Sequence, residues 1–467
     1  MKLREMLLAG CCVAVAALAG AAPAAADTTE DLLKQLRAKG ILTKQEYATL
    51  SKRRQTEAAA EAAAIRKEAE AAVAKTAPPA DASYVRVADK GIGVKIGSVN
   101  VGISGSINGF YVHDQADNSA GNTVAGGLAS TGKNSSAVRN GLLPGFLKID
   151  VTTKQGDFDV GGHFGIYPGI NSVSWTNGAN SGGSPQALST SGADFRQTYL
   201  TVAHAAVGEF KVGRDIGLFG SEAILNDMSL LGVGTAAANS APSNTSLGRI
   251  GLGYIYTDFQ PQISFTSAKF SGFSVGLGLF QPLTTIGSSE VNSQPGFQGK
   301  LTYDFESNGV TGRLWAGGIS QKHDETGTQR AYTGSGYEVG AKFGYGPASL
   351  LGYYYKGSGL GTTGLFILSA TATGQKRDSS GYYIQGTVTP IEKLTLGVSY
   401  GQSRLDLASG EVNPTLVETN SSWIGQVKYG LTPWVNLIGE YTATESKAHG
   451  GNKANSNALA LGAIMLF

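Results

Sequence analysis

The sequence is poor in cysteine, in charge and in long apolar runs. Its 467 residues include two cysteines, Cys11 and Cys12, and charged residues make up only 15% of the chain. Because both cysteines fall within the first twelve residues, the rest of the chain can neither form a disulfide nor use a thiol. After residue 26 no run of about 18 apolar residues occurs, which excludes a membrane-spanning helix there. The formal net charge of +2 argues against a nucleic-acid-binding protein.

The first 26 residues predict a cleavable signal peptide. Lys2 and Arg4 provide the basic start, residues 7–22 form the apolar segment, and the three alanines at 24–26 provide the cleavage site. Residues 8–11 also resemble a lipoprotein cleavage box that would place a lipid on Cys11. The apolar run before Cys11 is too short for that alternative, so we expect export without a lipid anchor.

Residues 27–77 differ in character from everything that follows. A short helix is expected up to Gly40, and Thr43 with Glu46 forms a capping box that opens a second helix. The stretch 55–75 is rich in Ala, Glu, Lys and Arg, which favour a helix but offer few large apolar groups. We therefore expect a periplasmic, coiled-coil-like segment, followed by a stiff proline-containing linker at 78–90.

From residue 91 to residue 467 the hydrophobic pattern has a period of two. Phe297, Leu301 and Phe305, for example, alternate with polar residues such as Gln298 and Thr302. In a strand, each set faces one side of the sheet. The chain contains 66 glycines and few charges, as expected when apolar residues are dispersed over many strands.

Connection lengths indicate the architecture. Links after even-numbered segments are short, whereas links after odd-numbered segments are long, such as 113–145 and 215–260. Short turns on one side and long loops on the other are typical of a transmembrane antiparallel β-barrel. The fold class is therefore all-β, with about 16 strands; 18 remain possible, because 249–258 also looks like a strand. The sixteen segments are 99–112, 146–154, 158–167, 194–204, 207–214, 261–269, 272–280, 296–306, 311–320, 336–345, 348–356, 379–389, 393–402, 421–429, 434–443 and 458–467.

Aromatic residues near the strand ends predict girdles at the two membrane interfaces, with ordinary core packing as the alternative. They are Tyr111, Tyr167, Tyr345, Tyr353, Tyr355, Tyr429, Trp434 and Tyr441.

Three segments resemble Gram-negative outer-membrane porins. The final strand ends at Phe467, which resembles the assembly signal of that family. Residues 270–276 are similar to the hairpin that follows the third loop of general trimeric porins. Residues 39–47 resemble the periplasmic prefix of the phosphate-selective porins O and P. The resemblance implies a water-filled pore in the outer membrane and a homotrimer.

Patterns for other chemistry are weak. Residues 272–276 match G-x-S-x-G, but period two continues after them, where a nucleophile elbow needs a helix. Residues 359–364 match a dinucleotide loop without the required strand-turn-helix unit. The five histidines are scattered and lack metal-site spacing. We therefore expect no enzyme activity, cofactor or metal.

The resemblance also implies a constriction in the pore. The third external loop of general porins narrows the channel, and the long 215–260 connection follows the fifth strand as that role requires. It contains a predicted helical turn at 221–230, whose Glu222 and Asp227 are the candidates for the acidic side. Alternation of side chains points basic residues of the wall toward the lumen as the opposing side. They are Lys148, Lys300, Lys342 and Lys428, joined by Arg196, Lys211 and Arg313.

The lumen is expected to mix charges of both signs. Asp150, Asp159, Asp304, Glu338 and Glu440 also point inward by alternation, whereas phosphate selectivity would require a ladder of basic residues alone. The sequence thus predicts passive diffusion of ions and small hydrophilic solutes with modest selectivity. The alternatives are an anion- or phosphate-preferring pore, and an outer-membrane anchor that contacts peptidoglycan through residues 27–77.

Overall fold

The computed structural model describes residues 32–76, 85–87, 91–172, 191–285 and 288–467. The chain divides into two units, Met1–Ala82 and Ser83–Phe467. The expected signal peptide lies outside the described residues, as does most of the expected linker. Within the described part, no helix combines the length and the apolar character needed to cross a membrane.

The first unit is helical where it is described. Residues 32–38 form one helix, and α3 (Lys44–Thr76) forms a second. The expected capping box is confirmed: the Glu46 backbone N–H donates to Thr43 Oγ1 at 3.2 Å, and the Thr43 N–H donates to Glu46 Oε2 at 2.9 Å. This reciprocal pair satisfies N–H groups that the helix start would otherwise leave without partners.

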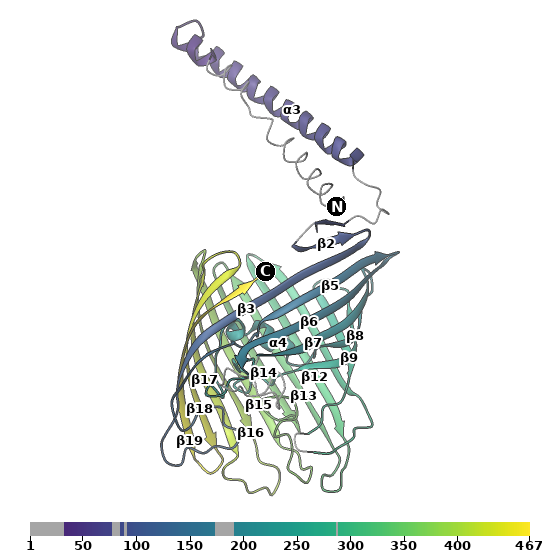
Figure 1. Ribbon diagram of the computed structural model, residues 1–467, viewed down its shortest axis with the longest axis vertical. Helices are drawn as coiled ribbons and strands as arrows, with labels where there is room; N and C mark the ends of the chain where they lie inside the picture. The colour runs from purple at the N-terminus through teal and green to yellow at the C-terminus, as the bar shows by residue number, and fades with distance from the viewer. Residues whose placement is uncertain (1–31, 77–84, 88–90, 173–190, 286–287) are drawn as a thin grey trace, which may run out of the picture. The chain divides into compact units, whose positions relative to one another are not determined.

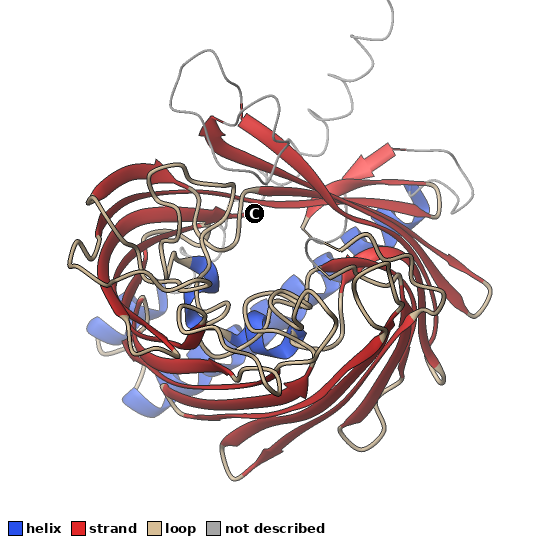
Figure 2. Cartoon of the chain, turned by 90° about the horizontal axis from the view of Figure 1, so that it is seen from below, coloured by secondary structure: helices blue, strands red, loops and turns tan. Residues whose placement is uncertain are grey.

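The second unit is a closed antiparallel barrel of sixteen strands (Figure 1). Each strand pairs with its neighbour along the chain, and β19 pairs with β3. The strands thus form a ring (Figure 2). All sixteen predicted segments correspond to wall strands. These are β3 (Val99–Gln115), β5 (Phe146–Gln155), β6 (Phe158–Ser172), β7 (Ser191–His204), β8 (Gly208–Ile216), β9 (Phe259–Ser267), β10 (Phe273–Phe280), β11 (Gly296–Ser307), β12 (Val310–His323), β13 (Tyr332–Tyr345), β14 (Ala348–Ser358), β15 (Asp378–Ile391), β16 (Leu394–Leu405), β17 (Val417–Gly430), β18 (Val435–Ala448) and β19 (Lys453–Leu466).

Three further short strands were not predicted: β1 (Val85–Val87), β2 (Ile92–Ile96) and β4 (Ser135–Arg139). β2 pairs with the start of β3, and β4 pairs with residues 110–114 of the same strand. The strand-like segment 249–258 does not join the wall; it forms turns and isolated bridges inside a long loop. The alternative of eighteen strands is therefore wrong.

The alternation of side chains is confirmed along the wall. On β11, Phe297 and Leu301 are exposed on the outer face, whereas Gln298 and Thr302 are buried inside. Exposed apolar side chains recur on the outer face of the other strands. An apolar outer surface on a closed barrel is the arrangement that a lipid bilayer requires.

Five of the eight predicted girdle residues are exposed, and the prediction is wrong for the other three. Tyr111, Tyr345, Tyr429, Trp434 and Tyr441 are all exposed on the wall, as interfacial girdles require. Tyr167, Tyr353 and Tyr355 are buried instead. Tyr353 and Tyr355 belong to an apolar cluster inside the barrel, so their neighbours are protein rather than lipid.

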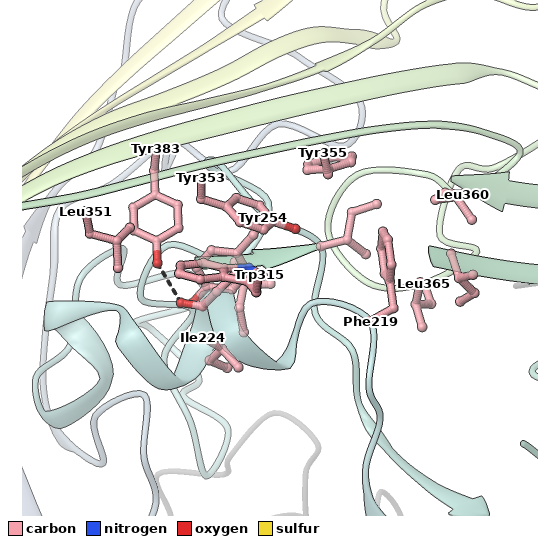
Figure 3. Packing of buried hydrophobic residues seen from close by; sticks show 14 of the residues in the cluster. Phe219, Ile224, Tyr254, Trp315, Leu351, Tyr353, Tyr355, Leu360, Leu365 and Tyr383 are labelled. Atoms are coloured by element: carbon pink, nitrogen blue, oxygen red, sulfur yellow. Dashed lines mark hydrogen bonds between the residues drawn. The ribbon is translucent and has the colours of Figure 1, made fainter. Parts of the chain in front are cut away.

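The long connection between β8 and β9, here called loop 3 (residues 217–258), folds into the barrel. It contains α4 (Ser221–Asn226) and the 3₁₀ turn η1 (Met228–Leu231), close to the predicted helical turn. Its apolar residues pack against inward side chains of β12, β14 and β15 in a buried cluster (Figure 3). Burial of each large apolar side chain contributes about 1.5–3 kcal/mol. Buried members include Phe219, Ile224, Tyr254, Trp315, Leu351, Tyr353, Tyr383, Leu360 and Phe366.

Candidate functional site

Loop 3 is fastened to the wall by buried acceptors. Gln298 on β11 accepts the backbone N–H groups of Leu218 and Phe219 at 2.9 and 3.0 Å. Glu338 on β13 accepts the Gly220 N–H at 2.9 Å. These N–H groups have no secondary-structure partner where the chain turns into α4, so inward polar side chains of the wall satisfy them.

The far end of loop 3 is held by a second carboxylate. Glu440 on β18 accepts the Val233 and Gly234 N–H groups at 2.5 and 2.9 Å, and the Gln426 amide at 2.8 Å. Arg139 on β4 is fully buried and donates to the carbonyls of Ala236, Ala237 and Thr245. Loop 3 therefore has fixed contacts on β4, β11, β13 and β18.

Two of the carboxylates that alternation placed in the lumen are thus anchors. Glu338 also accepts the Tyr353 hydroxyl at 2.7 Å, and both Glu338 and Glu440 are buried. Their inward direction follows from the sequence. Their role as anchors does not follow from the sequence, because the loop N–H groups that donate to them are more than a hundred residues away in the chain.

Glu222 on α4 meets two wall cations. Its carboxylate lies 2.9 Å from Lys300 Nζ and 3.4 Å from Arg313 Nε. Lys300 also donates to Ser221 Oγ at 3.0 Å. Arg313 lies 3.4 Å from Asp304, which also binds Lys269 at 2.6 Å. The structure therefore brings together one predicted acid and two predicted bases between α4 and the wall.

A cavity of about 300 Å³ opens beside this cluster. It lies between α4 and the ends of β8–β12, and Lys211 lines it as well. Lys211 pairs with Asp215 at 2.5 Å and lies 4.8 Å from the centre of the Tyr199 ring. The polar lining comprises Lys211, Ser221, Glu222, Gln262, Ser264, Thr266, Lys269, Ser274, Lys300, Thr302 and Arg313.

Asp227 has a different environment from Glu222. Its buried carboxylate accepts the Ser229 N–H and hydroxyl at 2.9 and 2.8 Å and the Tyr254 hydroxyl at 2.9 Å. Ser229 and Tyr254 both belong to loop 3, and Asp227 caps η1. The structure thus places Asp227 inside the packing of the loop, away from the cavity that Glu222 lines.

The remaining predicted bases are spread over the wall. Lys342 on β13 donates to Asn226 Oδ1 at the end of α4, at 3.1 Å. Arg196 on β7 pairs with Asp194 at 3.0 Å and lies over the Tyr167 ring. Lys148 on β5 and Lys428 on β17 are half-buried wall residues that do not line the cavity.

The wall of β5–β7 carries polar groups of both signs. Asp150 lies 2.6 Å from His163 Nδ1, and His163 Nε2 is 3.0 Å from Thr201 Oγ1. Asp159 lies 3.9 Å from Lys154. Mixed signs along this face are confirmed.

Sequence reasoning missed the apolar interior beneath loop 3. Trp315, Ile319 and Leu351 occupy inward positions that the barrel pattern assigns to polar residues. Strands with large apolar residues on both faces indicate burial on both sides. That signal was present on β12, β14 and β15 and could have located the wall against which the loop packs.

Comparisons with known proteins agree with this architecture. The family model described as Gram-negative porin matches residues 13–449. The outer membrane channel DcaP of Acinetobacter baumannii has a similar structure, with a TM-score of 0.58 and 17% identity, covering 83% of this chain and all of that one. No curated protein matches the sequence.

Two further solved structures share the fold. The anion-selective porin from Comamonas acidovorans gives a TM-score of 0.53 at 14% identity, covering 79% of this chain and all of that one. Salmonella typhi OmpF, in a complex with daunomycin, gives 0.50 at 14% identity, covering 79% and 98%. A family match over most of the chain, together with a closed sixteen-strand barrel narrowed by an inward loop, shows that this chain belongs to the Gram-negative porin family and forms a channel for passive diffusion across the outer membrane.

Proposed function

We propose that solutes pass between α4 and the wall of β5–β10. The observation that carries this proposal is the position of loop 3, whose apolar side packs against β12, β14 and β15 and fills that part of the interior. The wall on the other side presents polar groups such as Asp150, His163 and Lys211. The path is therefore lined by water-compatible groups on one side and by Glu222 on the other.

Within this path the pore is a general diffusion channel with modest selectivity. At the edge of the cavity, Glu222 forms contact ion pairs with Lys300 and Arg313. Paired charges of opposite sign produce a local field beside the path, which orients polar solutes without excluding either sign of ion.

The test is reconstitution of the purified protein into a planar lipid bilayer. Stepwise, ohmic conductance that rises with salt concentration supports the proposal. Folded barrels that add no conductance would contradict it and would favour a membrane anchor.

An anion preference is the second candidate. Glu222 is the single carboxylate among the residues that line the cavity, whereas Lys211, Lys269, Lys300 and Arg313 all line it. The reversal potential in a salt gradient gives the sign of the selectivity. A reversal potential that indicates a preference for cations would contradict this candidate.

For the rest of the chain we propose export by the 1–26 signal peptide and assembly as a homotrimer, with residues 27–77 in the periplasm. α3 is 33 residues long, with few large apolar groups, and a helix of that composition gains stability by packing against copies of itself. Peptidoglycan contact through 27–77 is the alternative. Cross-linking of the full chain and of a chain lacking 27–77 distinguishes them, because loss of trimers on deletion supports the bundle.

A further inference from the structure

The cavity beside α4 lies on the short-turn side of loop 3. Lys269 belongs to the turn between β9 and β10, Lys211 lies three residues after the start of β8, and Arg313 lies three residues after the start of β12. Short turns of outer-membrane barrels face the periplasm. The cavity is therefore a pocket on the periplasmic side of the constriction, rather than the constriction itself.

The charges of this cavity are unequally exposed. Lys211 is 23% exposed and its partner Asp215 only 5%. Lys300 and Arg313 are 17% and 37% exposed, against 9% for Glu222. Lys269 is 62% exposed, against 29% for Asp304. In each of these pairs the carboxylate is less exposed than the cation. The surface that a solute meets is therefore positive, although the numbers of positive and negative charges are nearly equal.

Hydroxyl groups complete the lining. Ser221, Ser264, Thr266, Ser274 and Thr302 all contribute to it. Three of these hydroxyls already donate to protein acceptors: Ser221 to the Leu218 carbonyl, Ser264 to Gln262 Oε1 and Ser274 to the Ser267 carbonyl. Their lone pairs remain able to accept hydrogen bonds from a solute. The cavity thus offers cations for an oxyanion and acceptors for hydroxyl groups.

We propose that this cavity is a saturable binding site for a small oxyanion, a carboxylate or a phosphate group, on a hydroxylated solute in transit. The inference rests on the proposed solute path along β5–β10. An oxyanion arriving from the periplasm reaches Lys211 and Lys269 without passing α4, whereas one arriving from outside must first pass it. Association from the periplasmic side is therefore faster.

The experiment measures block of single-channel current in bilayers by three probes: gluconate, inorganic phosphate and sorbitol. Sorbitol resembles gluconate but lacks its carboxylate. Insertion direction is read from a Val412→Cys variant, because Val412 is 91% exposed in the connection between β16 and β17 and the two native cysteines lie in the proposed signal peptide. An impermeant thiol reagent then marks the external side.

We expect gluconate or phosphate to block with a higher association rate from the periplasmic side, and sorbitol not to block. The more potent of the two anions identifies the oxyanion. Lys211→Gln should raise the half-blocking concentration about tenfold, the factor that loss of one charge-assisted hydrogen bond produces. Lys269→Gln, at an exposed side chain, tests the same site without disturbing buried structure.

Lys356→Gln is the matched control, because Lys356 is exposed on β14 and does not line the cavity. Equal rates from both sides, equal block by sorbitol, or unchanged block in both the Lys211 and Lys269 variants would overturn the site. Conductance in plain salt is recorded in the same traces. Absence of channels would refute the proposed path, whereas channels without block would refute only the binding site.

Discussion

Replacement of Glu440 by Ala should loosen loop 3 while leaving the barrel closed. The Glu440 carboxylate accepts the Val233 and Gly234 N–H groups, at 2.5 and 2.9 Å, in a buried site. Both N–H groups donate to the same oxygen, Glu440 Oε2, so alanine removes their shared acceptor and leaves two buried donors unsatisfied. Each hydrogen bond to a charged group contributes about 1.5–3 kcal/mol, so we expect about 3–6 kcal/mol of destabilisation, confined to the far end of the loop.

That energy has a measurable consequence in a single channel. A loss of about 3–6 kcal/mol raises the population of the detached loop end roughly a hundredfold to ten-thousandfold. Detachment changes the cross-section of the open path, so Glu440→Ala should show excess current noise and additional conductance levels. The β17–β18 and β18–β19 ladders do not involve this side chain, so the barrel should remain resistant to detergent denaturation.

The control is Glu392→Ala, at an exposed residue in the turn between β15 and β16. Its current traces should match those of the unaltered protein. Glu440→Gln retains one oxygen that can accept both N–H groups but carries no charge, so the hydrogen bonds are weaker and the noise should be intermediate. Quiet, single-level channels in Glu440→Ala would refute the claim that this carboxylate holds the loop.

Three further predictions concern charge, pH and packing. Glu222→Gln removes the carboxylate between Lys300 and Arg313 and should raise the anion-to-cation permeability ratio about twofold or more, because the site lies within a Debye length of passing ions; an unchanged reversal potential in a salt gradient would contradict this. The ion pair with Arg377 lowers the pKa of Glu411 to about 2. The pair therefore contributes at most about 3 kcal/mol to the stability of the folded state. This contribution is complete above the usual glutamate pKa near 4.5 and is lost as the pH falls toward 2. Proteolysis of the 406–416 connection should therefore accelerate over that acid range in the native protein and show no such dependence in Glu411→Gln. Trp315→Ala should lower the stability of the packed loop by about 3–5 kcal/mol, measured as a lower midpoint of thermal unfolding. Trp423→Ala, at a residue on the exposed outer face, should lower it less.

The sequence by itself determined the barrel. Period-two alternation assigns each side chain to lipid or lumen, and the parity of loop lengths orients the strands, because both properties are local to a strand and its turn. All sixteen wall strands follow from them. The capping box at Thr43 and the helical turn at α4 are equally local, and both appear where they were expected.

Only the tertiary structure decided what the inward residues do. Glu222 and Asp227 are five residues apart in one loop, yet one meets wall cations and the other caps a turn. Glu338 and Glu440 occupy inward positions in the alternating pattern, which predicts that they line the lumen. Both instead accept hydrogen bonds from backbone N–H groups of loop 3. These outcomes depend on contacts between residues far apart in the chain, which come together only when loop 3 folds across the closed barrel. A periodic pattern carries the direction of a side chain and contains no information about which distant segment will meet it.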